Sequence, residues 1–109
     1  MTELEITEGT TNVFADLGFP DAFERQTKTR LAYVLNEIIR NRRLKQVEVA
    51  NILQIPQPKV SALKNYRLDG FSVERLLEFL TALNRDVEIL IRPRDEDMGA
   101  GTISVFEVR

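Results

Sequence analysis

The chain has 109 residues, 29% of them charged, and its formal net charge is −2. This length suits a single domain with a modest hydrophobic core. The absence of cysteine and histidine removes disulfides, thiolate nucleophiles, imidazole bases and the usual zinc ligand sets, so the sequence predicts no enzyme, no metal site and no cofactor.

The charges are distributed unevenly along the chain. Residues 25–67 hold ten basic and two acidic residues, whereas residues 1–24 hold six acids and no base, and residues 68–109 hold nine acids and five arginines. A basic run alone is often only a solvated helix face. A basic run that coincides with a DNA-binding motif instead indicates a surface for phosphates.

The amino-terminal residues 1–12 show no hydrophobic periodicity and predict a mobile acidic tail. A secretory signal would begin basic and then turn apolar, and no apolar run in the chain is long enough to span a bilayer. We therefore expect a cytoplasmic protein without a membrane partner.

The first long helix is predicted to start at Asp21, which forms a capping-box pattern with Glu24, and to end near Arg43. Its inward stripe is Leu31, Val34, Leu35, Ile38 and Ile39, after which Leu44 turns inward. Three arginines close the last turns: Arg40, Arg42 and Arg43. They are either helix-end charges that favour the carboxyl end of the helix or direct DNA contacts.

The segment QVEVANILQIPQPKVSALKN predicts two short helices, at residues 46–53 and 57–65, that cross at a tight turn. Ala50 occupies the point of closest approach, and Pro56 and Pro58 mark the start of the second helix, where proline is tolerated. The inward apolar positions are Val49, Leu53, Ile55, Val60 and Leu63. Such a helix-turn-helix normally lays its second helix in the major groove of DNA.

A fourth helix is predicted from the N-cap Ser72 to about Asn84, with an inward stripe of Val73, Leu76, Leu77, Leu80 and Leu83. The helical spacing then gives way to strand-like sequence rich in β-branched residues. Residues 87–91 predict a strand stopped by Pro93, and residues 102–108 predict a second strand after a polar linker.

With these motifs in view, residues 31–83 resemble the Cro/C1-type, or XRE family, helix-turn-helix domain. The longer span from residue 12 to residue 93 looks like the HigA-like antitoxin branch, through NVFADLGFPDA, KQVEVANILQIPQPKVSALKN and LDGFSVERLLEFLTALNRDVEILIRP. Two positions depart from the family pattern. Lys45 replaces the usual Ser or Thr N-cap, and Gln54 replaces the glycine of the turn, which predicts a left-handed or bridging backbone conformation at Gln54.

The resemblance implies a mainly α fold: a four- to five-helix bundle of the lambda-repressor-like type with a short carboxyl-terminal β extension. We expect the tail at residues 1–12, the helix-turn-helix domain at residues 13–92, and a polar linker and strand at residues 93–109. The segment 93–109 is the expected dimerisation element. We also expect residues 87–91, just before it, to join the sheet or the helices of a partner subunit.

Carried over from the family, Gln57 is the first candidate for reading a base, because an amide can pair bidentately with adenine. Lys59 and Ser61 are the next base-reading candidates. The phosphate-binding candidates are Gln46, Lys64, Asn65, Arg67 and Arg43. Plainer interpretations stay open: Gln57 as an ordinary exposed residue, Ser61 as packing, Asn65 as a helix cap and Tyr66 as cover for the edge of the core.

The predicted function is a sequence-specific repressor that binds a palindromic double-stranded DNA operator as a homodimer, without a cofactor. The resemblance further implies an antitoxin that neutralises a RelE-like toxin, whose basic surface the acidic amino-terminal segment would complement. The alternative is a protein-interaction module on a helix-turn-helix scaffold. Salt-dependent DNA affinity distinguishes the two.

Overall fold

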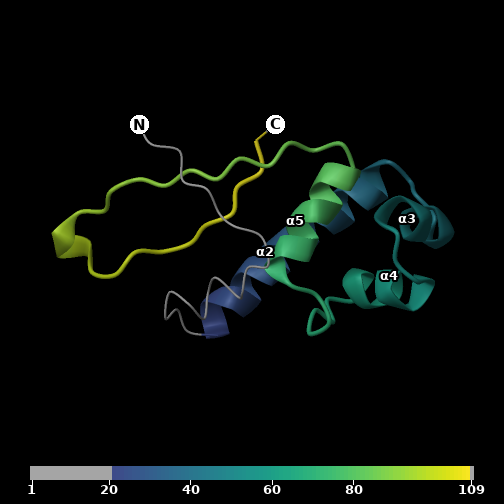
Figure 1. Cartoon of the computed structure of the whole chain (residues 1–109), viewed down its shortest axis with the longest axis horizontal. Coiled ribbons are helices and arrows are strands. Elements are labelled where there is room, and N and C mark those ends of the chain that lie inside the picture. Colours follow the sequence, from purple (N-terminus) through teal and green to yellow (C-terminus); the bar gives the residue numbers. More distant parts are fainter. Residues whose placement is uncertain (1–20, 109) are drawn as a thin grey trace.

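The computed structural model describes residues 21–108, so the predictions made for the amino-terminal tail lie outside the described residues. The described elements are α2 (Asp21–Asn41), α3 (Gln46–Leu53), α4 (Gln57–Lys64), α5 (Val73–Ala82) and the short 3-10 helix η1 (Glu96–Met98). Helices α2 and α5 lie side by side, with α3 and α4 at one end of the pair (Figure 1). We call residues 21–84 the helical body and residues 85–108 the arm, which extends toward the opposite end.

The helix boundaries follow the sequence prediction closely. Helix α3 has the predicted bounds, and α4 ends one residue earlier than expected. Helix α2 ends at Asn41, before the expected Arg43, because Arg43 adopts a positive φ of 53°, which a right-handed helix cannot contain. The start of α5 is confirmed: the Ser72 hydroxyl accepts a hydrogen bond from the Arg75 backbone N–H at 3.0 Å.

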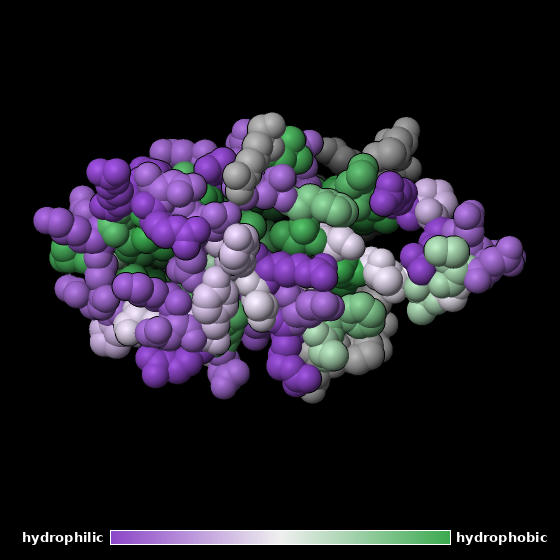
Figure 2. Space-filling model, turned by 180° about the vertical axis from the view of Figure 1, so that it is seen from behind, coloured by the Kyte–Doolittle hydropathy of each residue, from purple (hydrophilic) through white to green (hydrophobic). Residues whose placement is uncertain are grey.

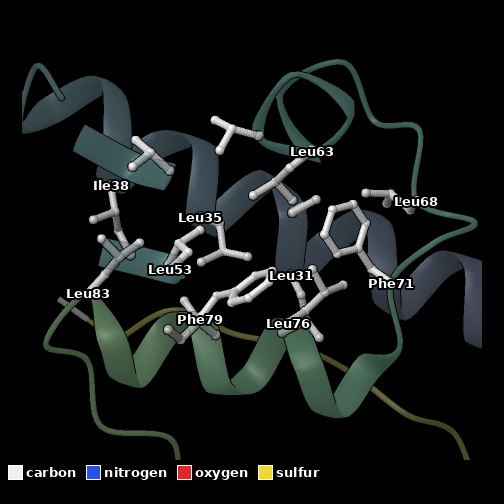
Figure 3. Close-up of a cluster of buried hydrophobic side chains, with 14 of the residues drawn as sticks. Leu31, Leu35, Ile38, Leu53, Leu63, Leu68, Phe71, Leu76, Phe79 and Leu83 are labelled. Carbon is white, nitrogen blue, oxygen red and sulfur yellow. The ribbon is translucent and has the colours of Figure 1, made fainter. Parts of the chain in front are cut away.

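The core lies where the four helices meet, with side chains from α2 and α5 pointing toward one another and toward α3 and α4 (Figure 3). The predicted Leu31, Leu35 and Ile38 of α2 are buried, and so are most of the positions predicted on the other helices. Phe79, 1% exposed, and Ala32 also belong to the core, although the predicted stripes omitted them.

Each of the four described α-helices is followed, within two residues of its end, by a non-glycine residue with positive φ: Arg43, Gln54, Tyr66 and Asn84. The residue after each of these donates its N–H to a carbonyl five positions back, as in Leu44 to Ile39 at 3.0 Å and Arg67 to Ala62 at 2.8 Å. This is the Schellman closure, which usually employs glycine. Of the two conformations predicted for Gln54, left-handed or bridging, the structure shows the left-handed one, with φ 58°.

The predicted carboxyl-terminal β extension is not supported, because the described residues include no strand. From residue 86 to residue 108 the single backbone–backbone hydrogen bond among described residues joins the Met98 N–H to the Asp95 carbonyl. Both predicted strand segments are extended, but an extended segment becomes a strand only when a neighbour satisfies its N–H and C=O groups. The described residues supply no such neighbour.

Candidate nucleic-acid interface

The α3–α4 turn fixes how α4 is presented. Gln54 ends α3 in the left-handed conformation, and its amide Nε2 donates to the Asn51 carbonyl at 2.7 Å. Pro56 is the N-cap of α4, and Pro58 lies in the first turn. Since proline fixes φ and the first-turn N–H groups have no intrahelical partner, both prolines stiffen the start of α4 without loss of a hydrogen bond.

A hydrogen bond across the turn joins the amino-terminal ends of α3 and α4. The Gln46 side-chain Nε2 donates to the backbone carbonyl of Gln57 at 3.2 Å. Lys45 cannot cap α3 with its side chain, but its backbone N–H donates to the Glu48 carboxylate at 2.7 Å. Two helix amino termini, each with partial positive charge, therefore lie close together at one surface.

Helix α4 buries Val60 and Leu63 and exposes the opposite face. With 100° between successive residues, the face opposite Val60 and Leu63 holds Pro58 and Ser61, and Gln57 lies at its edge. Gln57 and Pro58 are exposed, whereas Ser61 is half-buried. The exposed surface of α4 therefore lies chiefly in its first turn.

Lys59 lies on a different flank of α4 from Gln57 and Ser61. Its ammonium donates to the Gly70 carbonyl at 3.1 Å and sits 4.9 Å from the centroid of the Phe71 ring. Phe71 is buried and packs edge-on against Phe79, with ring centroids 5.8 Å apart. The Lys59 side chain thus connects α4 to the loop before α5.

The end of α4 carries three of the phosphate candidates. Lys64 and Arg67 are exposed and make no side-chain hydrogen bond or ion pair within residues 21–108. Asn65 is the C-cap of α4, and its amide Nδ2 donates to the Ser61 carbonyl at 2.9 Å, in agreement with its interpretation as a cap. Tyr66 is 42% exposed, so it covers the core edge only in part.

The three arginines at the end of α2 have different surroundings. Arg40 forms an ion pair with Glu37 at 3.0 Å, and Arg42 donates to the Leu83 carbonyl at 3.3 Å. Both match the helix-end interpretation. Arg43 is exposed and its side chain makes no hydrogen bond or ion pair with a described residue, so it is the member of the trio left available to an external anion.

No helix in residues 21–108 is long and apolar enough to cross a bilayer. The same residues contain no group of three or more acidic side chains arranged to hold a metal ion.

Comparison with known proteins agrees with this geometry. The helix-turn-helix domain family matches residues 13–92. A solved structure described as a "Putative XRE Family Transcriptional Regulator" is 57% identical, superposes with a TM-score of 0.79, and covers 82% of this chain and 100% of its own. The chain belongs to the XRE family of helix-turn-helix proteins. A search of curated proteins found no match.

For this XRE-family chain, the structure gathers Gln57 and Ser61 on one face of α4, with Gln46 beside the start of that helix. It places Lys59 on the flank next to the α4–α5 loop, and Lys64, Asn65 and Arg67 at the exit. Arg43 lies at the end of α2.

Proposed function

We propose that the protein is a DNA-binding transcriptional regulator that inserts α4 into the major groove and binds a palindromic operator as a homodimer. The observation that carries the proposal is the α3–α4 pair: an exposed helix face with a rigid start, tied to α3 by Gln46. The segment around it, residues 25–67, has ten basic and two acidic residues. Such a surface favours a polyanion.

The contacts divide into those that read sequence and those that bind the backbone. Gln57 can pair bidentately with adenine, and Ser61 can bond to any base edge. Contacts to backbone phosphates, which set the register of the protein on DNA, come from Gln46, Arg43, Lys64 and Arg67. The Lys59 ammonium binds the Gly70 carbonyl, and it can contact a base or a phosphate only after leaving that carbonyl.

Two copies are part of the proposal because one helix buries little DNA surface. Half-sites about one helical turn apart double the contacts and explain a palindromic site.

The test is a fluorescence anisotropy titration of the purified chain with random-sequence duplex DNA at several salt concentrations, followed by selection of bound sequences. We expect affinity to fall steeply with salt and selection to return a two-fold symmetric site. Affinity without salt dependence, or no binding, would indicate that the helix-turn-helix serves only as a scaffold for protein interaction.

The family resemblance also supports an antitoxin role toward a RelE-like ribonuclease. The supporting feature of this chain is its amino-terminal segment, where residues 1–24 carry six acids and no base. Such a segment complements the basic surface of an RNA-cleaving enzyme. Co-expression with a RelE-like protein encoded by the neighbouring gene tests this: a complex that also relieves growth arrest is expected, and unaffected toxicity would refute the role.

A further inference from the structure

The arm exposes more large apolar side chains than any other part of the described chain. Ile89, Leu90, Ile91, Phe106 and Val108 are between 71% and 88% exposed. Apolar surface appears in green between the helical end and the polar tip of the arm (Figure 2). Because large exposed apolar side chains are typical of interaction sites, the arm is the part of the described chain best suited to bind a partner.

The sequence from Arg85 to Asp95, RDVEILIRPRD, is complementary to itself when it is reversed about Leu90. In an antiparallel pair with two-fold symmetry, residue i faces residue j of the other copy and j faces i. With Leu90 opposite Leu90, Ile89 faces Ile91, and every charged residue faces one of opposite charge. These pairs are Arg85 with Asp95, Asp86 with Arg94 and Glu88 with Arg92, each formed twice.

Neighbouring registers lack this property. A shift of one residue in one direction places Arg85 opposite Arg94, and a shift in the other direction places Asp86 opposite Asp95. Like charges directly opposite destabilise a strand pair. Centring the pair on Ile91 places Asp86 opposite Glu96, again with like charges. The Leu90 register is therefore favoured over its neighbours.

Pro93 selects the hydrogen-bonding phase of this register. Opposed residues alternate between hydrogen-bonded and non-hydrogen-bonded pairs. If the two Leu90 residues form a hydrogen-bonded pair, then Pro93 and the opposed Val87 fall at a non-hydrogen-bonded pair. The N–H that proline lacks would point away from the partner there, so its absence costs no ladder bond.

The same register produces an amphipathic sheet. Val87, Ile89 and Ile91 share one face, and Val87 is already half-buried against the core of the body. The opposite face carries the charged residues of two of the three pairs and Leu90. Hydrophobic and polar faces of this kind are typical of antiparallel sheets that have one solvated side.

We infer that the occupant of the arm is a second copy of this chain, bound through antiparallel pairing of residues 85–95 about a two-fold axis at Leu90. This inference gives the interface of the homodimer in the proposed function, and the role of that interface in DNA binding rests on the proposed function. The charges of residues 85–95 are complementary to the same residues in reverse order, which is the arrangement that a second copy presents in an antiparallel pair. This self-complementarity favours a second copy of the chain over a different protein. The test of the inference requires no DNA.

The first experiment exchanges charges in the 88–92 pair. Glu88→Arg and Arg92→Glu each convert two attractive pairs into repulsive ones, and each should raise the dimer dissociation constant at least about tenfold. The double variant Glu88→Arg/Arg92→Glu should restore the homodimer, and an equimolar mixture of the single variants should form a heterodimer. Glu96→Arg, outside the paired segment, is the matched control and should dimerise like the parent chain.

The second experiment uses the absence of native cysteine. Under mild oxidation Leu90→Cys should cross-link two copies, because opposed Cα atoms of a strand pair lie within disulfide range. Ile91→Cys should not cross-link with itself, since in this register Ile91 faces Ile89. Circular dichroism verifies that the variants are folded.

A monomeric parent chain, single variants that dimerise normally, or a mixture that fails to pair would each overturn the inference. If the chain binds its operator while Leu90→Cys stays uncross-linked, the register is wrong and the proposed function stands. If the cross-link forms in a chain without affinity for DNA, the dimer stands and the proposed function fails.

Discussion

The helical body and the arm are both rich in apolar residues, but the body buries most of them and the arm leaves several exposed. In the body, apolar residues recur at helical spacing and meet in a shared core, where Leu35, Leu63 and Leu76 are fully buried. In the arm several stay exposed, as in Leu90 at 83% and Phe106 at 79%, although Val87, Ile103 and Val105 pack partly against the core. A helix satisfies its own backbone, whereas an extended segment needs a neighbour to do so. The helices of the body therefore satisfy their backbone groups within one chain, whereas the extended segments of the arm do not.

The largest expected effect is on the free energy of unfolding, and it is measured by one phenylalanine-to-alanine substitution in each region. Phe79→Ala should lower the free energy of unfolding by about 3–5 kcal/mol, because it removes a buried ring from the core. Phe106→Ala should change the stability of the dilute monomer by less than about 0.5 kcal/mol, because its ring is already in water. Urea unfolding at low protein concentration measures both. Equal losses would show that the arm is part of the folded core.

This contrast also explains what the sequence could predict. The bounds of α3 and the cap of α5 follow from local signals, namely apolar spacing, proline and Ser72, which act within a few residues. Whether residues 87–91 form a strand depends on a partner that no local pattern contains. The candidate interface divides in the same way: periodicity places Gln57 and Ser61 on one exposed face, but the engagement of Lys59 with Gly70 and Phe71 arises from folding of the loop.

Within the body, Gln57 is the residue whose loss should most affect recognition. Gln57→Ala removes an amide that can pair with adenine, so operator affinity should fall by roughly 1–3 kcal/mol and preference should relax at one base pair of each half-site. Stability should be unchanged because the side chain is exposed. Parallel binding-site selections on the parent and the variant decide this. Identical preferences would assign base reading to Ser61 or Lys59.

The exit of α4 should govern backbone affinity instead. Lys64→Ala or Arg67→Ala should weaken binding to all sequences alike and reduce the salt slope by about one unit for each phosphate that is no longer neutralised. Arg75→Ala is the control, since this exposed arginine lies on α5, outside both the candidate interface and the paired residues 85–95, with its guanidinium 5.0 Å from the centroid of the Phe79 ring. A slope that changes with Arg75 and not with Arg67 would move the DNA surface from the exit of α4 to α5.

Substitutions of Lys59 test whether this residue of α4 stabilises the fold or contacts DNA. Lys59→Met keeps the aliphatic stem but removes the hydrogen bond to Gly70 and the cation above the Phe71 ring, so stability should fall by about 0.5–1 kcal/mol. Lys59→Arg should retain most of that stability. Selected operator sequences should be the same for both variants. A changed base preference with unchanged stability would instead make Lys59 a base reader.

The smallest expected effect concerns the turn between α3 and α4. Gln54 holds a left-handed conformation that costs any residue with a Cβ more than it costs glycine. Gln54→Gly should remove this strain and raise stability by about 0.5 kcal/mol, because the hydrogen bond to the Asn51 carbonyl that it gives up is exposed and the greater freedom of glycine in the unfolded chain offsets part of the gain. Thermal unfolding of parent and variant side by side measures the difference. Asn51→Ala serves as the control, because it replaces a side chain but keeps the backbone carbonyl that Gln54 binds. A fall in melting temperature for Gln54→Gly would mean that the side-chain bond to Asn51 outweighs the backbone strain, and the turn would then depend on glutamine for its shape.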